Sequence, residues 1–174
     1  LYSDVPADHS PDGTVFQTFE GGMKGPYSPE HFIAAIEFWE RSGVEVIIID
    51  SASKEWEGVL ECLAEDYNGK ITAWAKLTPR HNKFIEKIVK SPVHIIVTLR
   101  SKTDFAIDKE AGKKATVEKL GTKIVQRDGF EYELTLLFSV GQNHYATCEK
   151  DRTSLYKNCH PFVINTETGE KLLE

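Results

Sequence analysis

Asp50 ends a run of mostly apolar, β-branched residues, 44–49, and Ser51 follows it directly. Such a run, bounded by Gly43 and by small polar residues, predicts a strand that is buried on both faces of a parallel sheet. Because ligands bind such sheets at the carboxyl ends of the strands, the Asp50 carboxylate is expected to project into a crevice there. This is the Walker B pattern, in which an Asp holds Mg²⁺ beside the phosphates of a nucleotide. The alternative is an Asp that caps the following helix.

A second buried strand is predicted at 93–99, and it too is followed by charged residues, Arg100 and Lys102. Two strands that end in charged groups on one side of a sheet are the first indication of a site. The elements around these strands are predicted from caps and from the helical spacing of apolar residues. They are helices over residues 29–42, 53–67 and 79–90. Alternating helices and strands favour an α/β fold with a mostly parallel sheet.

The charge of the chain is unevenly distributed. Its 174 residues carry a formal net charge of −6 and are 40% hydrophobic, which is enough apolar material for the core of one soluble domain. Residues 100–127 hold eight Lys or Arg against four acids, a local charge of +4 that leaves −10 on the remainder. The totals argue against a wholly basic nucleic-acid binder, but they predict an acidic body with one basic loop. A solvated, disordered loop is the alternative.

The C-terminal part of the chain predicts a β-hairpin. Residues 130–140 alternate as a strand, 141–143 form a turn and 144–148 return, after which the chain reads KDRT at 150–153. A last short strand is predicted at 162–164, followed by a Thr-Glu-Thr-Gly turn. Near the N-terminus, one edge strand is predicted at 14–19.

The cysteines favour a reducing compartment. Cys62, Cys148 and Cys159 are odd in number and lack CxxC spacing, which is typical of free thiols. A zinc site made with His144 and His160 is disfavoured, since adjacent Cys and His residues seldom bind one ion. No run approaches the roughly 20 apolar residues of a membrane span, and no basic-then-apolar leader opens the chain. A cytoplasmic location is therefore the default expectation.

In this order, the motifs of the chain resemble those of RecA-like ATPases carried by bacteriophages, a group of AAA-type nucleotide-binding proteins linked to single-strand annealing recombination. The resembling segments are IIIDSAS with Glu55-Trp56, TPRH at 78–81, TLRSKTDF at 98–105, QRDGFEYEL at 126–134 and KDRT at 150–153. They cover most of the chain from Ser28 onward. The resemblance implies a single RecA-like three-layer core, whose mostly parallel sheet the antiparallel hairpin extends. It also implies ATP and Mg²⁺ as cofactors, single-stranded DNA as a partner and a homo-oligomer.

The resemblance implies roles for the residues that follow the two strands. Asp50 would be the water-mediated Mg²⁺ ligand, with Ser51 beside the nucleotide. Glu55 would orient the attacking water, and the alternative is a solvated acid in the first turn of a helix. Arg100 and Lys102 stand where the family has a polar sensor of the γ-phosphate, and their alternative is a solvated basic loop.

Two cations near the C-terminus stand where such rings and filaments reach into the neighbouring subunit's nucleotide. These are Lys150 and Arg152, and a guanidinium suits that role because it stays charged and binds a phosphate with two hydrogen bonds. The alternative is a pair of cations in a β-turn beside Asp151.

The basic loop stands where RecA-like proteins hold DNA. Phe105 would stack on a base, while lysines follow the phosphates. The lysines proposed for this are Lys102, Lys113 and Lys114.

One departure from the family is large, because no GxxxxGK[ST] motif is present. In the family that loop lies upstream, and a start at Leu1 rather than Met favours a fragment that begins after it. The glycine-rich residues 21–25 lack a preceding buried strand and are expected to form a flexible loop. The chain alone is therefore expected to be inactive as an ATPase.

Two other functions stay open at this stage. One is a non-catalytic module that binds single-stranded DNA through the basic loop, with Asp50 in a structural role. The other is a Mg²⁺-dependent nuclease built on Asp50 and Glu55, although the usual acid-x-Lys spacing is absent near these acids.

Overall fold

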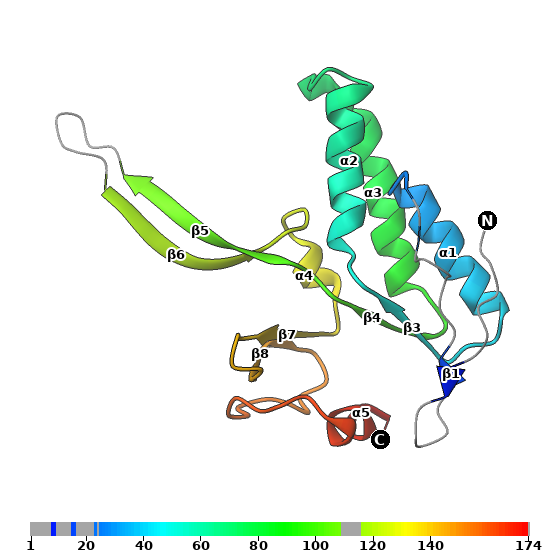
Figure 1. The fold of residues 1–174 in the computed structure, drawn as a ribbon, viewed down its shortest axis with the longest axis vertical. Coiled ribbons are helices and arrows are strands. Elements are labelled where there is room, and N and C mark those ends of the chain that lie inside the picture. Colours follow the sequence, from blue (N-terminus) through cyan, green and yellow to red (C-terminus); the bar gives the residue numbers. More distant parts are fainter. Residues whose placement is uncertain (1–7, 10–14, 17–22, 24, 109–115, 174) are drawn as a thin grey trace. The chain divides into compact units, whose positions relative to one another are not determined.

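The computed structural model describes residues 8–9, 15–16, 23, 25–108 and 116–173. The chain forms two compact units, Leu1–Gln126 and Arg127–Glu174, and each is described by itself. Together they give a mixed α/β fold made of small parallel and antiparallel sheets (Figure 1).

In the first unit the helices lie close to their predicted positions. Helix α1 spans Pro29–Arg41, with the Ser28 hydroxyl accepting a hydrogen bond from the His31 amide at 3.3 Å. Gly43 takes φ +77° just after it, a conformation that suits glycine and ends the helix. Helix α2 spans Ser53–Glu65. These bounds confirm the predicted helices to within a few residues.

Helix α3 differs from its prediction at the start. It spans Trp74–Val89 after a short 3-10 turn, η1, at Ile71–Ala73, so Pro79 lies inside the helix rather than at its first position. The reason is tertiary packing. Trp74 stacks on Trp56 of α2 with ring centroids 5.7 Å apart, and this contact extends the helix ahead of the proline.

The three helices pack on one another through an apolar core. Val59 of α2 and Leu77 of α3 are almost fully buried in it. Phe32 of α1 meets Phe84 of α3 edge to face at 5.5 Å. An Arg80–Glu30 ion pair at 2.7 Å joins α3 to α1 on the rim of this core.

The two predicted buried strands are parallel neighbours. Strand β3, Val46–Ile49, pairs in parallel with β4, His94–Val97, with Ile49 opposite Val97. Burial on both faces was predicted, and this is wrong for the described residues. Ile47 and Ile49 are buried, whereas Val46 and Ile48 on the opposite face are 46% and 58% exposed. The helices cover one face, so a three-layer RecA-like core stays a prediction.

The predicted basic loop is instead largely a β-hairpin. Strand β5, Ser101–Asp108, pairs antiparallel with β6, Thr116–Ile124, with a register shift between Asp104 and Phe105. In Figure 1 the hairpin follows directly from the end of β4. The many charged residues hide the alternation of apolar positions, and this is why the sequence read as a loop.

The second unit contains the C-terminal hairpin, but its sheet is separate. Strand β7, Leu136–Val140, pairs antiparallel with β8, Ala146–Asp151, in a two-stranded sheet of its own. The prediction that this hairpin extends the parallel sheet is therefore wrong for the described residues. Phe138 packs against the rings of Tyr156 and Phe162 at 5.0 and 5.6 Å, which gives the unit its own small aromatic core.

Three local predictions in this unit are corrected. The start of the predicted strand is a short helix, α4, at Phe130–Glu133, because Gly129 at φ +97° turns the chain into it. The predicted strand at 162–164 makes only an isolated bridge from Phe162 to Ala146 within the described residues. The predicted Thr-Glu-Thr-Gly turn opens helix α5, Thr166–Leu173, whose first turn is capped by the Asn165 side chain.

Near the N-terminus, β1 at Asp8–His9 pairs antiparallel with β2 at Val15–Phe16. The latter confirms part of the strand predicted at 14–19, and 14 and 17–19 lie outside the described residues. The glycine-rich segment 21–25 also falls mostly outside them. Among the residues that the structure describes, no helix has the length and apolar character needed to cross a membrane.

Candidate functional site

Asp50 lies at the carboxyl end of β3 and is exposed to solvent. The parallel register places Thr98, which follows β4, beside it, and the Thr98 hydroxyl donates to Asp50 Oδ1 at 2.5 Å. The capping alternative is wrong, since α2 begins after Ala52 and has no side-chain cap. Thr98 was not singled out from the sequence, although its place at the end of the second strand was a usable signal.

The turn between Asp50 and α2 is held tightly against the end of β4. The Ala52 amide donates to the Thr98 carbonyl at 3.0 Å, and the Ser53 hydroxyl accepts from the Arg100 amide at 3.0 Å. Ala52 and Ser53 are fully buried, and Ser51 is half-buried. The peptide bond between Asp50 and Ser51 is cis. The hydrogen bonds from Ala52 and to Ser53 fix the backbone from which the Asp50 carboxylate projects.

Glu55, in the first turn of α2, is fully buried, so the alternative of a solvated acid is wrong. Its carboxylate oxygens both lie 3.0 Å from Nδ1 of His81, which is itself fully buried on α3. Burial raises the pKa of Glu55, while its hydrogen bond with His81 acts in the opposite direction. The water-activating role of Glu55 stays a prediction. The His81 contact was missed because it joins two helices.

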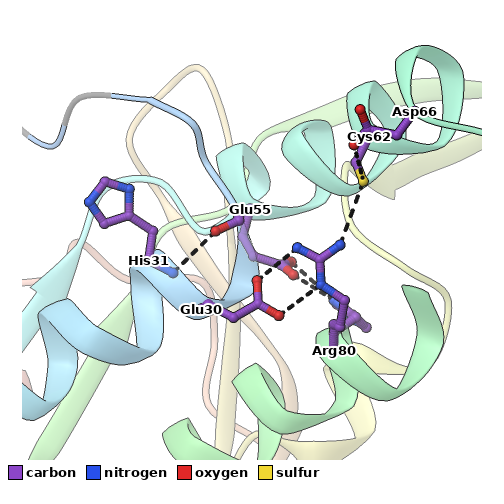
Figure 2. Close-up of polar contacts among 8 residues, drawn as sticks. Glu30, His31, Glu55, Cys62, Asp66 and Arg80 are labelled. Carbon is purple, nitrogen blue, oxygen red and sulfur yellow. Dashed lines mark hydrogen bonds and ion pairs between the residues drawn. The ribbon is translucent and has the colours of Figure 1, made fainter. Parts of the chain in front are cut away.

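Figure 2 shows a polar network in the same region that the sequence analysis did not anticipate. Arg80 binds both carboxylate oxygens of Glu30, at 2.7 and 2.8 Å. Its Nη1 also lies 3.5 Å from Sγ of Cys62, whose thiol donates to Asp66 at 3.1 Å. Burial, followed by the bond to Asp66, raises the pKa of the Cys62 thiol. The network ties α1, α2 and α3 together.

Arg100 and Lys102 lead from β4 into the hairpin and are both exposed. The Arg100 guanidinium pairs with Glu57 of α2 at 2.8 Å, and Lys54 binds the same carboxyl group at 2.7 Å. These hydrogen bonds and charges, that of Lys54 first, lower the pKa of Glu57. Lys102 lies directly opposite Lys123 in the hairpin register.

Lys150 and Arg152 belong to the second unit, where both donate to backbone carbonyls at the end of α4. Lys150 Nζ lies 3.0 Å from the Glu131 carbonyl, and both side chains reach the Tyr132 carbonyl at 2.5 Å. Desolvation, and then the charge of Arg152, lower the pKa of Lys150. Asp151 between them accepts hydrogen bonds from the backbone of the following turn. The predicted role of these cations in a neighbouring subunit stays a prediction.

Of the four predicted DNA contacts, Lys102 and Phe105 lie on the hairpin. Phe105 is in β5, opposite Lys119 in the register, while Lys113 and Lys114 lie outside the described residues. No group of three or more metal-ligating side chains is found in the part of the chain that the structure describes. The cysteines are free, as predicted.

The residues at the end of β3 fit a nucleotide-bound Mg²⁺ in part. Mg²⁺ prefers oxygen ligands and keeps several waters, and Asp50 offers an exposed carboxylate beside the hydroxyls of Ser51 and Thr98. When bound, the ion would neutralise phosphate charge. A loop that grips the phosphates is a separate requirement, and the sequence contains no GxxxxGK[ST] motif that would form one.

Comparison with known proteins gives a match to one family model, described as an AAA domain, over residues 9–173. No curated protein and no solved structure matches the chain. The matched range covers most of the chain, including both strands that form the Asp50 site and all but the last residue of the second unit. The chain thus belongs to the AAA domain family of P-loop NTPases, which indicates a nucleotide-binding, ATPase-like function.

Proposed function

We propose that this chain is the Walker B and sensor part of a RecA-like ATPase that acts on single-stranded DNA in recombination of phage type. The observation that carries the ATPase part is the exposed Asp50 at the end of β3, hydrogen-bonded to Thr98 at the end of the neighbouring parallel strand. Membership of a P-loop NTPase family supports this assignment.

Each residue at this edge has a task in the proposal. Asp50 holds the water shell of the nucleotide's Mg²⁺, and Thr98 fixes the rotamer of the carboxylate by donating to one of its oxygens. Ser51 lies next to the phosphates. Arg100 and Lys102 respond to the γ-phosphate, and the pairing of Arg100 with Glu57 holds its guanidinium beside α2 until a stronger anion competes for it.

The phosphate-gripping loop comes, in this proposal, from a segment outside these 174 residues. Asp50 helps to hold an ion that the phosphates themselves bring, so the chain alone should not hydrolyse ATP. In the assembled protein, Lys150 and Arg152 exchange the carbonyls of α4 for the nucleotide of a neighbouring subunit. A guanidinium gains more from a phosphate than from a neutral carbonyl.

We assign Glu55 to positioning rather than to water activation. A base must reach a water beside the γ-phosphate, whereas Glu55 is fully buried and bound to His81. The same burial removes the support for a nuclease built on Asp50 and Glu55.

The ATPase proposal is tested by comparing the isolated chain with the protein that also contains a phosphate loop. We expect no ATP turnover from the chain, and turnover from the longer protein that Asp50→Ala abolishes. The matched control is Glu61→Ala, which removes another exposed acid of the first unit. ATP turnover by the isolated chain that depends on Asp50 would overturn the proposal that the phosphate-binding loop lies outside these 174 residues.

The DNA part rests on the hairpin, where Lys102 and Lys123 face each other across the strands. It also supports the second candidate function, a non-catalytic DNA-binding module. If lysines of the hairpin neutralise phosphates, affinity for an oligonucleotide should fall with salt, with a logarithmic slope of about 0.7 per phosphate. Phe105→Ala should weaken binding by about 1–3 kcal/mol if the ring stacks on a base.

The test is a fluorescence titration of the longer protein with nucleotide at two salt concentrations. Lys113→Glu with Lys114→Glu should lower affinity for all sequences alike, because phosphate contacts do not read sequence. The control, Lys70→Glu with Lys83→Glu, makes the same change of charge on the helical part of the first unit. Equal losses in the two double variants would mean that the hairpin makes no specific contact with the strand.

A further inference from the structure

Both ends of the β5–β6 hairpin are fastened to the turn that follows Asp50. At the start of β5, the Arg100 amide donates to the buried hydroxyl of Ser53 at 3.0 Å. Just after β6, the Gln126 side chain donates through Nε2 to the Ala52 carbonyl at 3.1 Å. The Val125 amide then donates to the Arg100 carbonyl at 2.7 Å, which joins the two ends to each other. Two hydrogen bonds therefore link the base of the hairpin to the turn, and a third closes the base itself.

Gln126 makes its contact inside the protein. Its side chain is 4% exposed, and Ala52 is fully buried. A buried amide that loses its partner costs far more free energy than an exposed one, so the bond to Ala52 fixes the orientation of the side chain. The Gln126 side chain also hydrogen-bonds the Glu55 carboxylate, which is held in turn by His81 of α3. Gln126 thus lies between the turn and the rigid helical core.

We propose that Gln126 is a positioning residue, which couples the β5–β6 hairpin to the turn that carries Asp50 through its buried hydrogen bond to Ala52. A movement of the hairpin base shifts the Ala52 carbonyl, and with it the backbone from which Asp50 projects. By reciprocity, whatever holds Asp50 in place also restrains the hairpin. The identity of the ligands rests on the proposed function, whereas the coupling itself does not.

The coupling can be measured without any ligand. Lys102 and Lys123 lie directly opposite each other near the base of the hairpin, at a spacing that a disulfide can bridge. Lys102→Cys with Lys123→Cys, in a Cys159→Ser background, would lock or release the base when oxidised or reduced. The readout is hydrogen exchange of the Ala52 amide, which donates to the Thr98 carbonyl. The Phe84 amide in α3 serves as a control for global stability.

With Gln126 present, oxidation should slow the exchange of the Ala52 amide by about fivefold or more, because locking the hairpin suppresses the openings of the turn. With Gln126→Met, which keeps the length of the side chain but has no donor, oxidation should change this exchange by less than about twofold. If Gln126 had only a structural role, Gln126→Met would speed the exchange of the Ala52 amide equally in the oxidised and the reduced protein. The comparison of the two states therefore isolates the coupling.

A second variant guards against poor folding of Gln126→Met. Gln126→Asn keeps the amide but is one methylene too short to reach Ala52, so it should give the same small response to oxidation. The proposal would be overturned if oxidation slowed the exchange of the Ala52 amide equally in the protein with Gln126 and in the Gln126→Met and Gln126→Asn variants. Because no nucleotide or DNA is used, that result would leave the assignment of Asp50 unaffected.

Discussion

Asp50 and Glu55 are close in the sequence, yet one carboxylate is exposed at the end of β3 while the other is buried between α2 and α3. The exposed one accepts a hydrogen bond from the Thr98 hydroxyl, and both oxygens of the buried one lie at 3.0 Å from Nδ1 of His81. The turn and the first turn of α2 rotate the chain so that the two acids face different environments. An exposed carboxylate beside a hydroxyl group can bind a metal ion. A buried carboxylate that is paired with a histidine instead stabilises the interface between two helices.

Of the substitutions that test this difference, removal of His81 should lower the free energy of unfolding the most. His81→Leu takes the imidazole away from the buried Glu55 carboxylate, and breaking a buried pair in this way costs about 3–5 kcal/mol. Urea denaturation of the isolated chain measures the free energy of unfolding. The matched control is His94→Leu, which replaces an exposed histidine of β4. A loss below about 1 kcal/mol would show that the Glu55–His81 contact is not structural.

The buried acid also predicts a dependence of stability on pH. The folded pKa of Glu55 is raised above 4.5 by burial, so the folded protein binds more protons than the unfolded chain above that pH. The free energy of unfolding should therefore fall as the pH rises from 4.5 through the folded pKa, by at most about 1.4 kcal/mol per pH unit.

Glu55→Gln should remove this slope, since an amide oxygen still accepts from His81 but does not ionise. Urea denaturation of both proteins across the pH range gives the comparison. An identical pH dependence in the two proteins would assign the titration to another group.

Loss of the Thr98 hydroxyl should have a smaller effect. Thr98→Val keeps the shape of the side chain and removes one hydrogen bond to an exposed carboxylate, which is worth about 0.5–1.5 kcal/mol. Thermal unfolding of the isolated chain measures this loss. A cost as large as that of His81→Leu would mean that the end of β3 and the helix interface are equally structural, and the contrast between the two acids would fail.

The smallest effect is expected at Arg100. Its pair with Glu57 is largely exposed, and such pairs contribute about 0.2–1 kcal/mol. Arg100→Gln should therefore leave stability almost unchanged and reduce its dependence on salt. A larger loss in the free energy of unfolding, measured by urea denaturation, would show that the pair stabilises the fold. Arg100 would then not be available to bind a ligand.

The helices and strands that depend on a local pattern of residues could be predicted from the sequence. The apolar run before Asp50 and the Ser28–Pro29 cap determined β3 and α1, and the expectation of a parallel sheet is confirmed for the pair β3 and β4. Polar segments with hidden alternation were missed, as β5 and β6 show. The helix α5 was missed because its turn-forming residues Thr166–Gly169 read as a loop.

The partners of the site residues could not be predicted in the same way, because tertiary packing brings them together. Thr98 is 48 residues from Asp50, His81 is 26 from Glu55, and Gln126 is 74 from Ala52. No local spacing indicates such contacts. The exposure of Asp50 and the burial of Glu55 follow from the same packing, and for this reason the sequence did not reveal that the two acids lie in different environments.

The most direct test of this account places a paramagnetic ion at the proposed site. In the longer protein that contains a phosphate loop, Mn²⁺ with a nucleotide should broaden the NMR amide signals of Ser51 and Arg100. We expect Asp50→Asn to abolish this broadening and Glu55→Gln to keep it. Broadening that survives in Asp50→Asn, or that disappears in Glu55→Gln, would contradict the assignment of Asp50 as the ligand and of Glu55 as the structural acid.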